Sequence, residues 1–208
     1  MASEDWYRNT SWNAEIETAF NQRLERSRSQ KAQYLRIQGS ILKDTHPEIA
    51  IRLLKRCVDQ RDEFHIAHAL LDTAHAQLVL GEVDAALDTL EAVIEQEKRQ
   101  PRFRTSAAYD YPFLVALHGR TERYQGALDL LESHPDGFFE SMIFEAETAR
   151  ALIFEAQGKH ALAKEASRKA LAAASVEAGP VPGYPEVGIV PSGSHPLHER
   201  LRRIAGAT

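Results

Sequence analysis

Four side chains capable of metal or acid–base chemistry follow one predicted helix over residues 63–80. They are His65, His68, Asp72 and His75, separated by three, four and three residues. This spacing places them on one stripe of a helix, and imidazole and carboxylate groups are zinc ligands. At about 1.5 Å per residue, however, His65 and His75 lie about 15 Å apart. At most His68, Asp72 and one neighbour could share an ion, so a small-ligand or metal-responsive regulator is an alternative function rather than the leading one.

Signatures of catalysis are absent from the sequence. It contains neither a Gly-x-Ser-x-Gly nucleophile elbow nor a Gly-x-x-x-x-Gly-Lys phosphate loop. The single cysteine, Cys57, stands in an apolar helical pattern and is predicted to be a small buried hydrophobe. We therefore expect a protein that is not an enzyme and has no cofactor.

Composition and charge narrow the class of protein. Hydrophobic residues make up 43% of the chain and charged residues 26%, which is typical of a globular protein. The net charge of -5 argues against a broad nucleic-acid-binding surface, which needs a basic excess. The first nine residues lack the apolar stretch of a secretory signal, and no apolar run approaches the roughly 20 residues of a membrane span. The expectation is a cytoplasmic protein without membrane association.

The elements that must position these side chains are all predicted to be helices, because apolar residues recur at spacings of three and four. Helices are expected from Thr10 or Ser11, over 29–43, from Pro47, and over 63–80, 82–98, 105–118, 123–133, 138–157, 160–175 and 196–204. Glycines or prolines interrupt the pattern at short intervals. Such an alternation of helix, short turn and helix indicates a repeat architecture.

The predicted second helices align on four alanines, Ala50, Ala86, Ala127 and Ala163, which are 36, 41 and 36 residues apart. The stretches Gly-Glu-Val-Asp-Ala-Ala-Leu from residue 81 and Gly-Lys-His-Ala-Leu-Ala from residue 158 resemble the turn and second helix of the tetratricopeptide repeat. The family's small first-helix residue is matched by Ala74 and Ala151, but Gln38 and Val115 stand there in the other two units, and the family's first-helix tryptophan is missing.

The resemblance covers about residues 29–175. It implies a right-handed α-solenoid of about four helical hairpins. The Trp-Tyr-Arg-Asn-Thr-Ser-Trp start and the Gln-Tyr-Leu-Arg-Ile-Gln stretch are similar to uncharacterised bacterial proteins of this repeat type.

Three regions follow from this interpretation. Residues 1–28 form an N-terminal segment and capping helix, in which Trp6 and Trp12 pack against the first hairpin. Residues 29–177 form the four hairpins. Residues 178–208 form an extended tail ending in a short helix, which covers either the last hairpin, the favoured alternative, or the groove. Prolines and glycines exclude a helix from the first part of the tail: Gly179, Pro180, Pro182, Gly183, Pro185, Gly188, Pro191 and Gly193.

In the tetratricopeptide family, first helices line a concave groove. Carried over to this chain, the resemblance implies a non-catalytic module that binds a protein or peptide. The predicted partner-binding residues are Arg36, His68, Asp72, His75, Tyr109, Phe113 and Glu145. Solvent-exposed helix faces without a partner are the alternative explanation of these residues.

The identity of the partner stays open between several kinds of protein. An adaptor or a chaperone fits an array of this size, and so does an immunity protein, whose acidic charge would suit a basic bacterial toxin. The tail or the final hairpin could also mediate a homodimer.

Two basic clusters complete the inventory of candidate sites. Arg23, Arg26, Arg28 and Lys31 form the first, and Arg99, Arg102 and Arg104 form the second. Either could bind phosphate, although acidic neighbours favour solvated faces or salt bridges to a partner.

Overall fold

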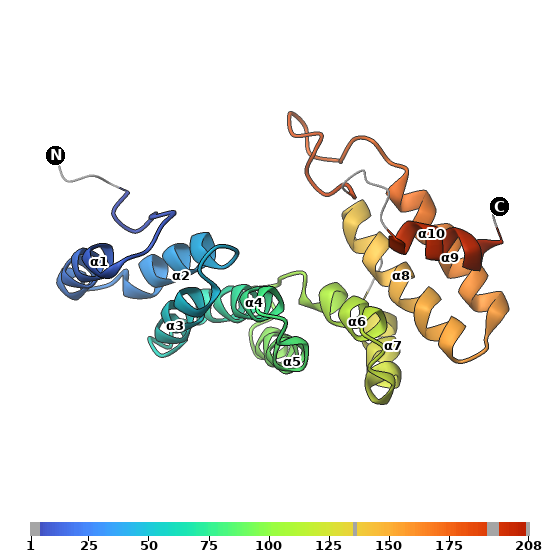
Figure 1. Cartoon of the computed structure of the whole chain (residues 1–208), viewed down its shortest axis with the longest axis horizontal. Coiled ribbons are helices and arrows are strands. Elements are labelled where there is room, and N and C mark those ends of the chain that lie inside the picture. Colours follow the sequence, from blue (N-terminus) through green and yellow to red (C-terminus); the bar gives the residue numbers. More distant parts are fainter. Residues whose placement is uncertain (1–4, 135–136, 191–195, 207–208) are drawn as a thin grey trace. The chain divides into compact units, whose positions relative to one another are not determined.

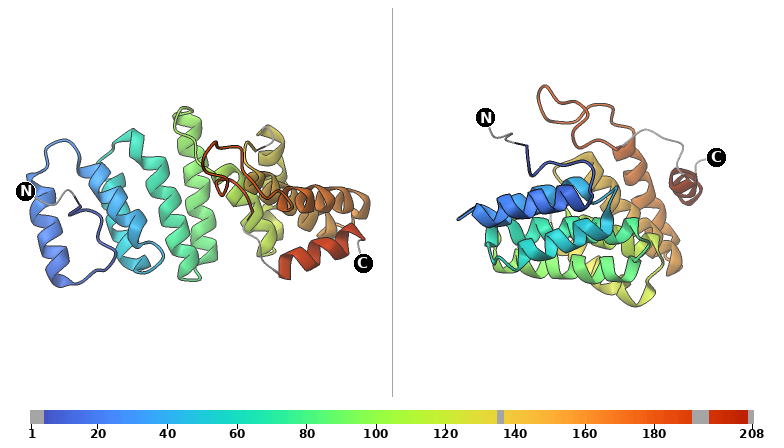
Figure 2. Two further views of the ribbon diagram at one scale, coloured as in Figure 1. Left: turned by 90° about the horizontal axis from the view of Figure 1, so that it is seen from above. Right: turned by 60° about the vertical axis from the view of Figure 1, so that its left-hand side comes forward.

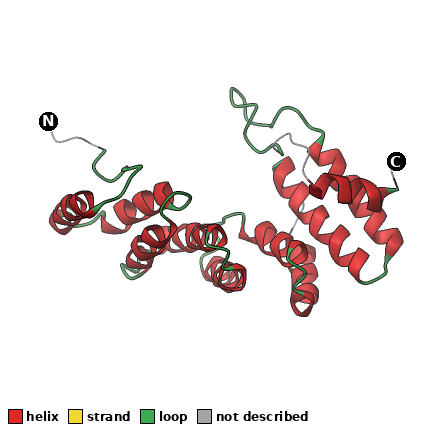
Figure 3. Ribbon diagram, in the orientation of Figure 1, coloured by secondary structure: helices red, strands yellow, loops and turns green. Residues whose placement is uncertain are grey.

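The structure is a computed structural model of the chain and describes residues 5–134, 137–190 and 196–206. All regular elements in these ranges are helices, and none of these residues lies in a strand (Figure 3). The prediction of an all-α protein is confirmed. None of the described helices is both long and apolar enough to cross a membrane.

The helices agree with the predicted ranges to within about three residues at most boundaries. In chain order they are α1 (Ala14–Arg26), α2 (Lys31–Leu42), α3 (Pro47–Val58), α4 (Glu63–Val79), α5 (Val83–Arg99), α6 (Ala107–Leu117), the 3-10 turn η1 (Thr121–Arg123), α7 (Tyr124–Ser133), α8 (Glu140–Ala156), α9 (His160–Ala174) and α10 (Pro196–Ala205). Four of the described helices end at glycines with left-handed backbone, Gly81 (φ 77°), Gly119 (φ 63°), Gly158 (φ 71°) and Gly206 (φ 69°). This conformation is strained for a residue with a Cβ, which explains why glycine stands there.

The chain divides into two compact units, Met1–Ala107 and Ala108–Thr208. In the first unit, α2 packs on α3, α3 on α4, and α4 on α5, so consecutive helices lie side by side (Figures 1 and 2). The contact between α2 and α3 is close because Gly39 of α2 has no side chain. A Cβ at Gly39 would stand 2.6 Å from Cγ of Leu54 on α3.

The first helix begins later than predicted, at Ala14 rather than near Thr10 or Ser11. Its cap is Asn13, whose side chain accepts a hydrogen bond from the backbone amide of Ile16 at 2.9 Å. The residues before the cap belong to an aromatic cluster instead. The ring centroid of Trp6 lies 5.4 Å from that of Phe20 and 4.8 Å from that of Tyr34. The ring centroids of Trp12 and Phe20 are 5.5 Å apart.

The N-terminal segment is tied to α2 by Gln38, which is fully buried. The Oε1 atom of Gln38 accepts hydrogen bonds from the backbone amide and the Nδ2 of Asn9, at 2.9 and 2.8 Å. The Nε2 of Gln38 donates to the carbonyl oxygen of Asn9 at 2.7 Å. All hydrogen-bonding atoms of the Gln38 amide are thus used, which explains a polar residue at a position where a small residue was expected.

In the second unit, α8 packs on α9, and α10 packs on both (Figure 1). Leu197, Leu201 and Ala205 are the buried residues of α10. The hydroxyl of Ser167 on α9 donates to the carbonyl of Leu201 at 2.6 Å. The short C-terminal helix therefore covers one side of the last hairpin.

Residues 179–188 of the tail form a loop held by backbone hydrogen bonds. The amide of Gly179 donates to the carbonyl of Pro185 at 2.7 Å, and the amide of Ser141 at the start of α8 donates to Gly188 at 2.9 Å. Pro191 and Gly193 of the predicted tail lie outside the described residues.

Candidate functional site

Side chains from α2 and α4 form a polar face in the first unit. This α2/α4 polar face consists of Arg36, Lys43, His68, Asp72 and His75, all of them half-buried. The Nζ of Lys43 lies 3.5 Å from Oδ1 of Asp72, with the two side chains 23% and 13% exposed. Asp72 is therefore already neutralised within the fold. Lys43 was not among the predicted residues, because its proximity to Asp72 depends on how α2 packs against α4.

The environment of the polar face favours the neutral form of His68. Burial lowers the pKa of His68, and the nearby positive charge of Arg36 lowers it further, while Asp72 and Glu97 act in the opposite direction. His65, at the N-terminal end of the stripe, is buried beneath the face, and burial lowers its pKa as well. Neutral imidazoles both donate and accept hydrogen bonds.

Two buried polar atoms at this site have no hydrogen-bond partner in the described part of the chain, the Nε of Arg36 and the Nδ1 of His65. Buried polar atoms are normally satisfied, and each exception requires an explanation. Arg36 lies close enough to His65 and His68 for its charge to act on both. The unsatisfied donor therefore belongs to the same group of side chains as the predicted binding residues.

The metal-binding alternative has no geometric support in this arrangement. Within residues 5–134, 137–190 and 196–206, no group of three or more His, Cys, Asp and Glu side chains is placed to hold a metal ion. Cys57 is likewise unsuited to nucleophilic chemistry. Its thiol is buried and donates to the carbonyl of Ala32 at 3.2 Å, and burial raises its pKa to about 12.

The remaining predicted residues lie in the second unit. Tyr109 and Phe113 are half-buried on α6, and Glu145 is half-buried on α8. Glu145 forms a side-chain hydrogen bond with Asp110 of α6. Burial raises the pKa of Glu145 to about 8, and the charge and hydrogen bond of Asp110 contribute to the same shift. At neutral pH this shift favours the protonated form of Glu145.

This acid pair changes the expected chemistry of the second unit. A protonated Glu145 presents a hydrogen-bond donor rather than a negative charge. Asp110 was not predicted, because only the tertiary structure brings this residue of α6 to Glu145 on α8. The predicted set is thus divided, with Arg36, His68, Asp72 and His75 in one unit and Tyr109, Phe113 and Glu145 in the other.

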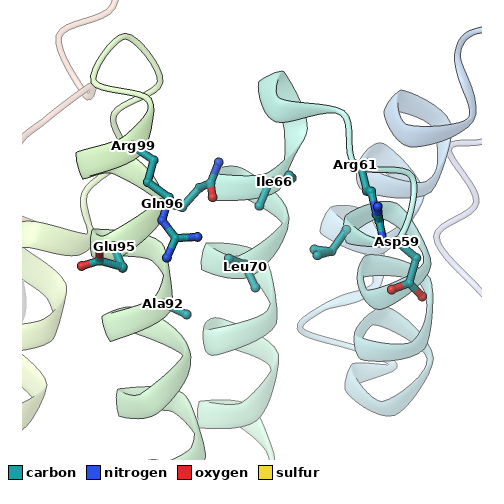
Figure 4. Close-up of a pocket in the computed structure, with 9 residues that line it drawn as sticks. Asp59, Arg61, Ile66, Leu70, Ala92, Glu95, Gln96 and Arg99 are labelled. Carbon is teal, nitrogen blue, oxygen red and sulfur yellow. The ribbon is translucent and has the colours of Figure 1, made fainter.

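A cavity of about 700 Å³ opens on a different side of α4 (Figure 4). Ile66 and Leu70 of α4 and Ala92 of α5 supply apolar lining, while Arg61 and Arg99 stand among the polar residues around it. At 100° per residue, Ile66 and Leu70 lie on the face of α4 opposite His68 and Asp72. Sequence reasoning missed this cavity, since its walls come from α3, α4 and α5 together.

Comparison of the chain with protein-family models, with curated proteins and with solved structures finds no match. The resemblance to the tetratricopeptide repeat is therefore supported only by the sequence stretches and aligned alanines described above.

Proposed function

We propose that the chain is a non-catalytic binding module, built of tetratricopeptide-like helical hairpins, that holds an extended segment of a partner protein. In the first unit the segment would lie along the α2/α4 polar face. The proposal has two parts, the repeat architecture and the binding face, and each is supported by separate observations.

The repeat architecture is supported by a local pattern that recurs along the chain, a glycine that ends one helix followed by a buried alanine in the next. A left-handed glycine ends α4, α6 and α8, and the helix after each carries a buried alanine, Ala86, Ala127 and Ala163 respectively. Five residues separate glycine from alanine in the first and third cases, and eight in the second. The three additional residues match the length of the 3-10 turn η1, Thr121–Arg123. This local insertion accounts for three of the five residues by which the 41-residue spacing exceeds the 36-residue spacings.

The binding face is supported most directly by the half-buried guanidinium group of Arg36. It lies near His65 and His68, whose pKa values burial lowers. Carbonyl and carboxylate oxygens of an extended peptide are suitable acceptors for a guanidinium group. A hydrogen bond from the accessible part of Arg36 to such an oxygen would be strong, because it is charge-assisted and partly screened from water.

The test is capture of partners from the native host on the immobilised wild-type protein and on the triple variant Arg36→Gln, His68→Ala and His75→Ala. Loss of one specific protein from the triple variant is the expected result. The control variant is Lys55→Gln, Gln60→Ala and Lys98→Gln, which changes three exposed residues elsewhere in the same unit. It should retain that protein.

The captured protein is then purified and added to the wild-type chain for hydrogen-exchange measurements. New protection should be concentrated in residues 31–42 and 63–79. Equal capture by wild type and triple variant, or protection confined to other helices, would refute the proposed face.

A further inference from the structure

A second concave site lies in the first unit, where α1 ends and α2 begins. It has a volume of about 500 Å³, within the range of small-molecule pockets. We call it the α1/α2 pocket. Its walls come from the last turn of α1, the connection over residues 27–30, Tyr34 of α2 and the N-terminal residue Trp6. It is thus separate from the α2/α4 polar face and from the cavity lined by α3, α4 and α5.

The charge of the α1/α2 pocket is opposite to that of the whole chain. Arg23, Arg26 and Arg28 line it, and no carboxylate does. The chain as a whole carries a net charge of -5. In the described part of the chain, no ion pair neutralises any of these three guanidinium groups. The helix dipole accounts for Arg23 and Arg26 in the last turn of α1, and Arg28, beyond that helix, adds a third exposed guanidinium group.

The backbone around the pocket adds to its positive character. The cap position of α2, Gln30, makes no side-chain hydrogen bond to the first turn of the helix. The amide of Gln30 is itself held by Ser27 Oγ at 3.3 Å. The first-turn amides of α2 therefore keep their partial positive charge next to the three arginines. Guanidinium groups beside free amides are the combination that recognises phosphate oxygens.

The pocket also contains a rigid aromatic wall. Trp6 and Tyr34 line it, and their rings contact each other at 4.8 Å. The ring of Trp6 also contacts Phe20, and the hydroxyl of Tyr34 donates to Gln30 Oε1. A fixed aromatic surface beside a cluster of cations matches a ligand that has both an anionic group and a planar group.

We propose that the α1/α2 pocket binds a phosphorylated small molecule with a planar group, of the nucleotide class. The three arginines contact its phosphate oxygens, and Trp6 and Tyr34 contact its ring. This inference does not depend on the α2/α4 polar face, so either proposal can fail without the other.

The chain contains two tryptophans, so Trp12→Phe leaves Trp6 as the only one and makes it a reporter of the pocket. Fluorescence of this protein is measured during titration with ADP and, separately, with pyrophosphate. Both should give a saturable change, with ADP binding more tightly than pyrophosphate because only ADP has a ring. The triple substitution Arg23→Gln, Arg26→Gln and Arg28→Gln in the same background should weaken ADP binding at least tenfold.

The matched control is Arg168→Gln, Arg202→Gln and Arg203→Gln, which removes the same charge from exposed residues of the second unit. It should bind ADP as the parent does. No saturable change with either probe, or equal weakening in both triple variants, overturns the site. Pyrophosphate binding as tight as ADP overturns the role of the aromatic wall. Circular dichroism verifies that both triple variants remain folded.

Discussion

At the scale of single residues, the most consequential feature is the hydrogen-bonded acid pair of Glu145 and Asp110. Burial and the neighbouring carboxylate together raise the pKa of Glu145 from 4.5 to about 8. In the unfolded chain Glu145 loses its proton near pH 4.5, whereas in the folded chain it keeps the proton up to about pH 8. Between these values folding takes up a proton, so this group makes stability decrease as pH rises.

Replacement of Glu145 by Gln should remove this pH dependence, because the amide keeps the shape of the side chain without titrating. The free energy of unfolding of Glu145→Gln, minus that of the wild type, should therefore increase from pH 6 to pH 8. The increase should be at most about 1.4 kcal/mol per pH unit. Urea unfolding of both proteins across this range measures the difference. The histidines titrate in both proteins and cancel in the comparison. A constant difference between the two proteins from pH 6 to pH 8 would contradict the raised pKa.

At the scale of elements, the α2–α3 contact depends on a glycine. A methyl group at Gly39 would overlap with the Leu54 side chain. We expect Gly39→Ala to destabilise the protein by about 1–3 kcal/mol, the usual range for an overpacked core. The double variant Gly39→Ala/Leu54→Ala should lose less than the sum of the two single variants, since the shorter side chain at 54 accommodates the methyl group. Chemical denaturation of the four proteins gives this coupling.

Gly126 provides the matched control for this prediction. It lies inside α7, and a Cβ there would meet no atom within 4 Å. Gly126→Ala should therefore stabilise the protein by about 0.5–1 kcal/mol, because alanine is the better helix former. If Gly39→Ala stabilises the protein as Gly126→Ala does, the close helix contact is wrong.

The attachment of the N-terminal segment to α2 is a second property of the elements. Gln38 makes three hydrogen bonds to Asn9. Gln38→Ala should cost about 1–3 kcal/mol and should release residues 5–12 from α2, since the buried polar groups of Asn9 lose their partner. Faster hydrogen exchange in this segment measures the release. Gln22→Ala, at an exposed residue of α1, should leave that exchange unchanged.

At the scale of the whole molecule, the chain consists of two compact units that meet in sequence at Ala107 and Ala108. Stacked hairpins interact mainly with their immediate neighbours, so that a local loss of stability need not spread along the array. In the first unit α2 packs on α3, α3 on α4 and α4 on α5, as the proposed repeat architecture requires.

A destabilised hairpin in the first unit should therefore leave the second unit unaffected. In Gly39→Ala, we expect faster hydrogen exchange in residues before Ala108 and unchanged exchange after it. Mass spectrometry of peptides from both units tests this. A uniform increase over the whole chain would show instead that the two units unfold together.

Sequence alone determined the helical class and the approximate position of each helix. Those features depend on local physics, the apolar period of 3.6 residues and the residues that start or end a helix, such as Pro47 and Gly81. The cap of the first helix is Asn13 and not Thr10 or Ser11. All three are residue types that cap helices, so the sequence does not identify which of them is used.

Only the tertiary structure decided which polar side chains meet. Gln38 binds Asn9, Lys43 approaches Asp72, and Glu145 shares a hydrogen bond with Asp110. Each pair joins residues 29 or more positions apart in the sequence, and each pairing depends on where the tertiary structure places a helix relative to another segment, which helical periodicity does not specify. The candidate binding residues could therefore be named from their helix faces, but the partners that set their charge could not.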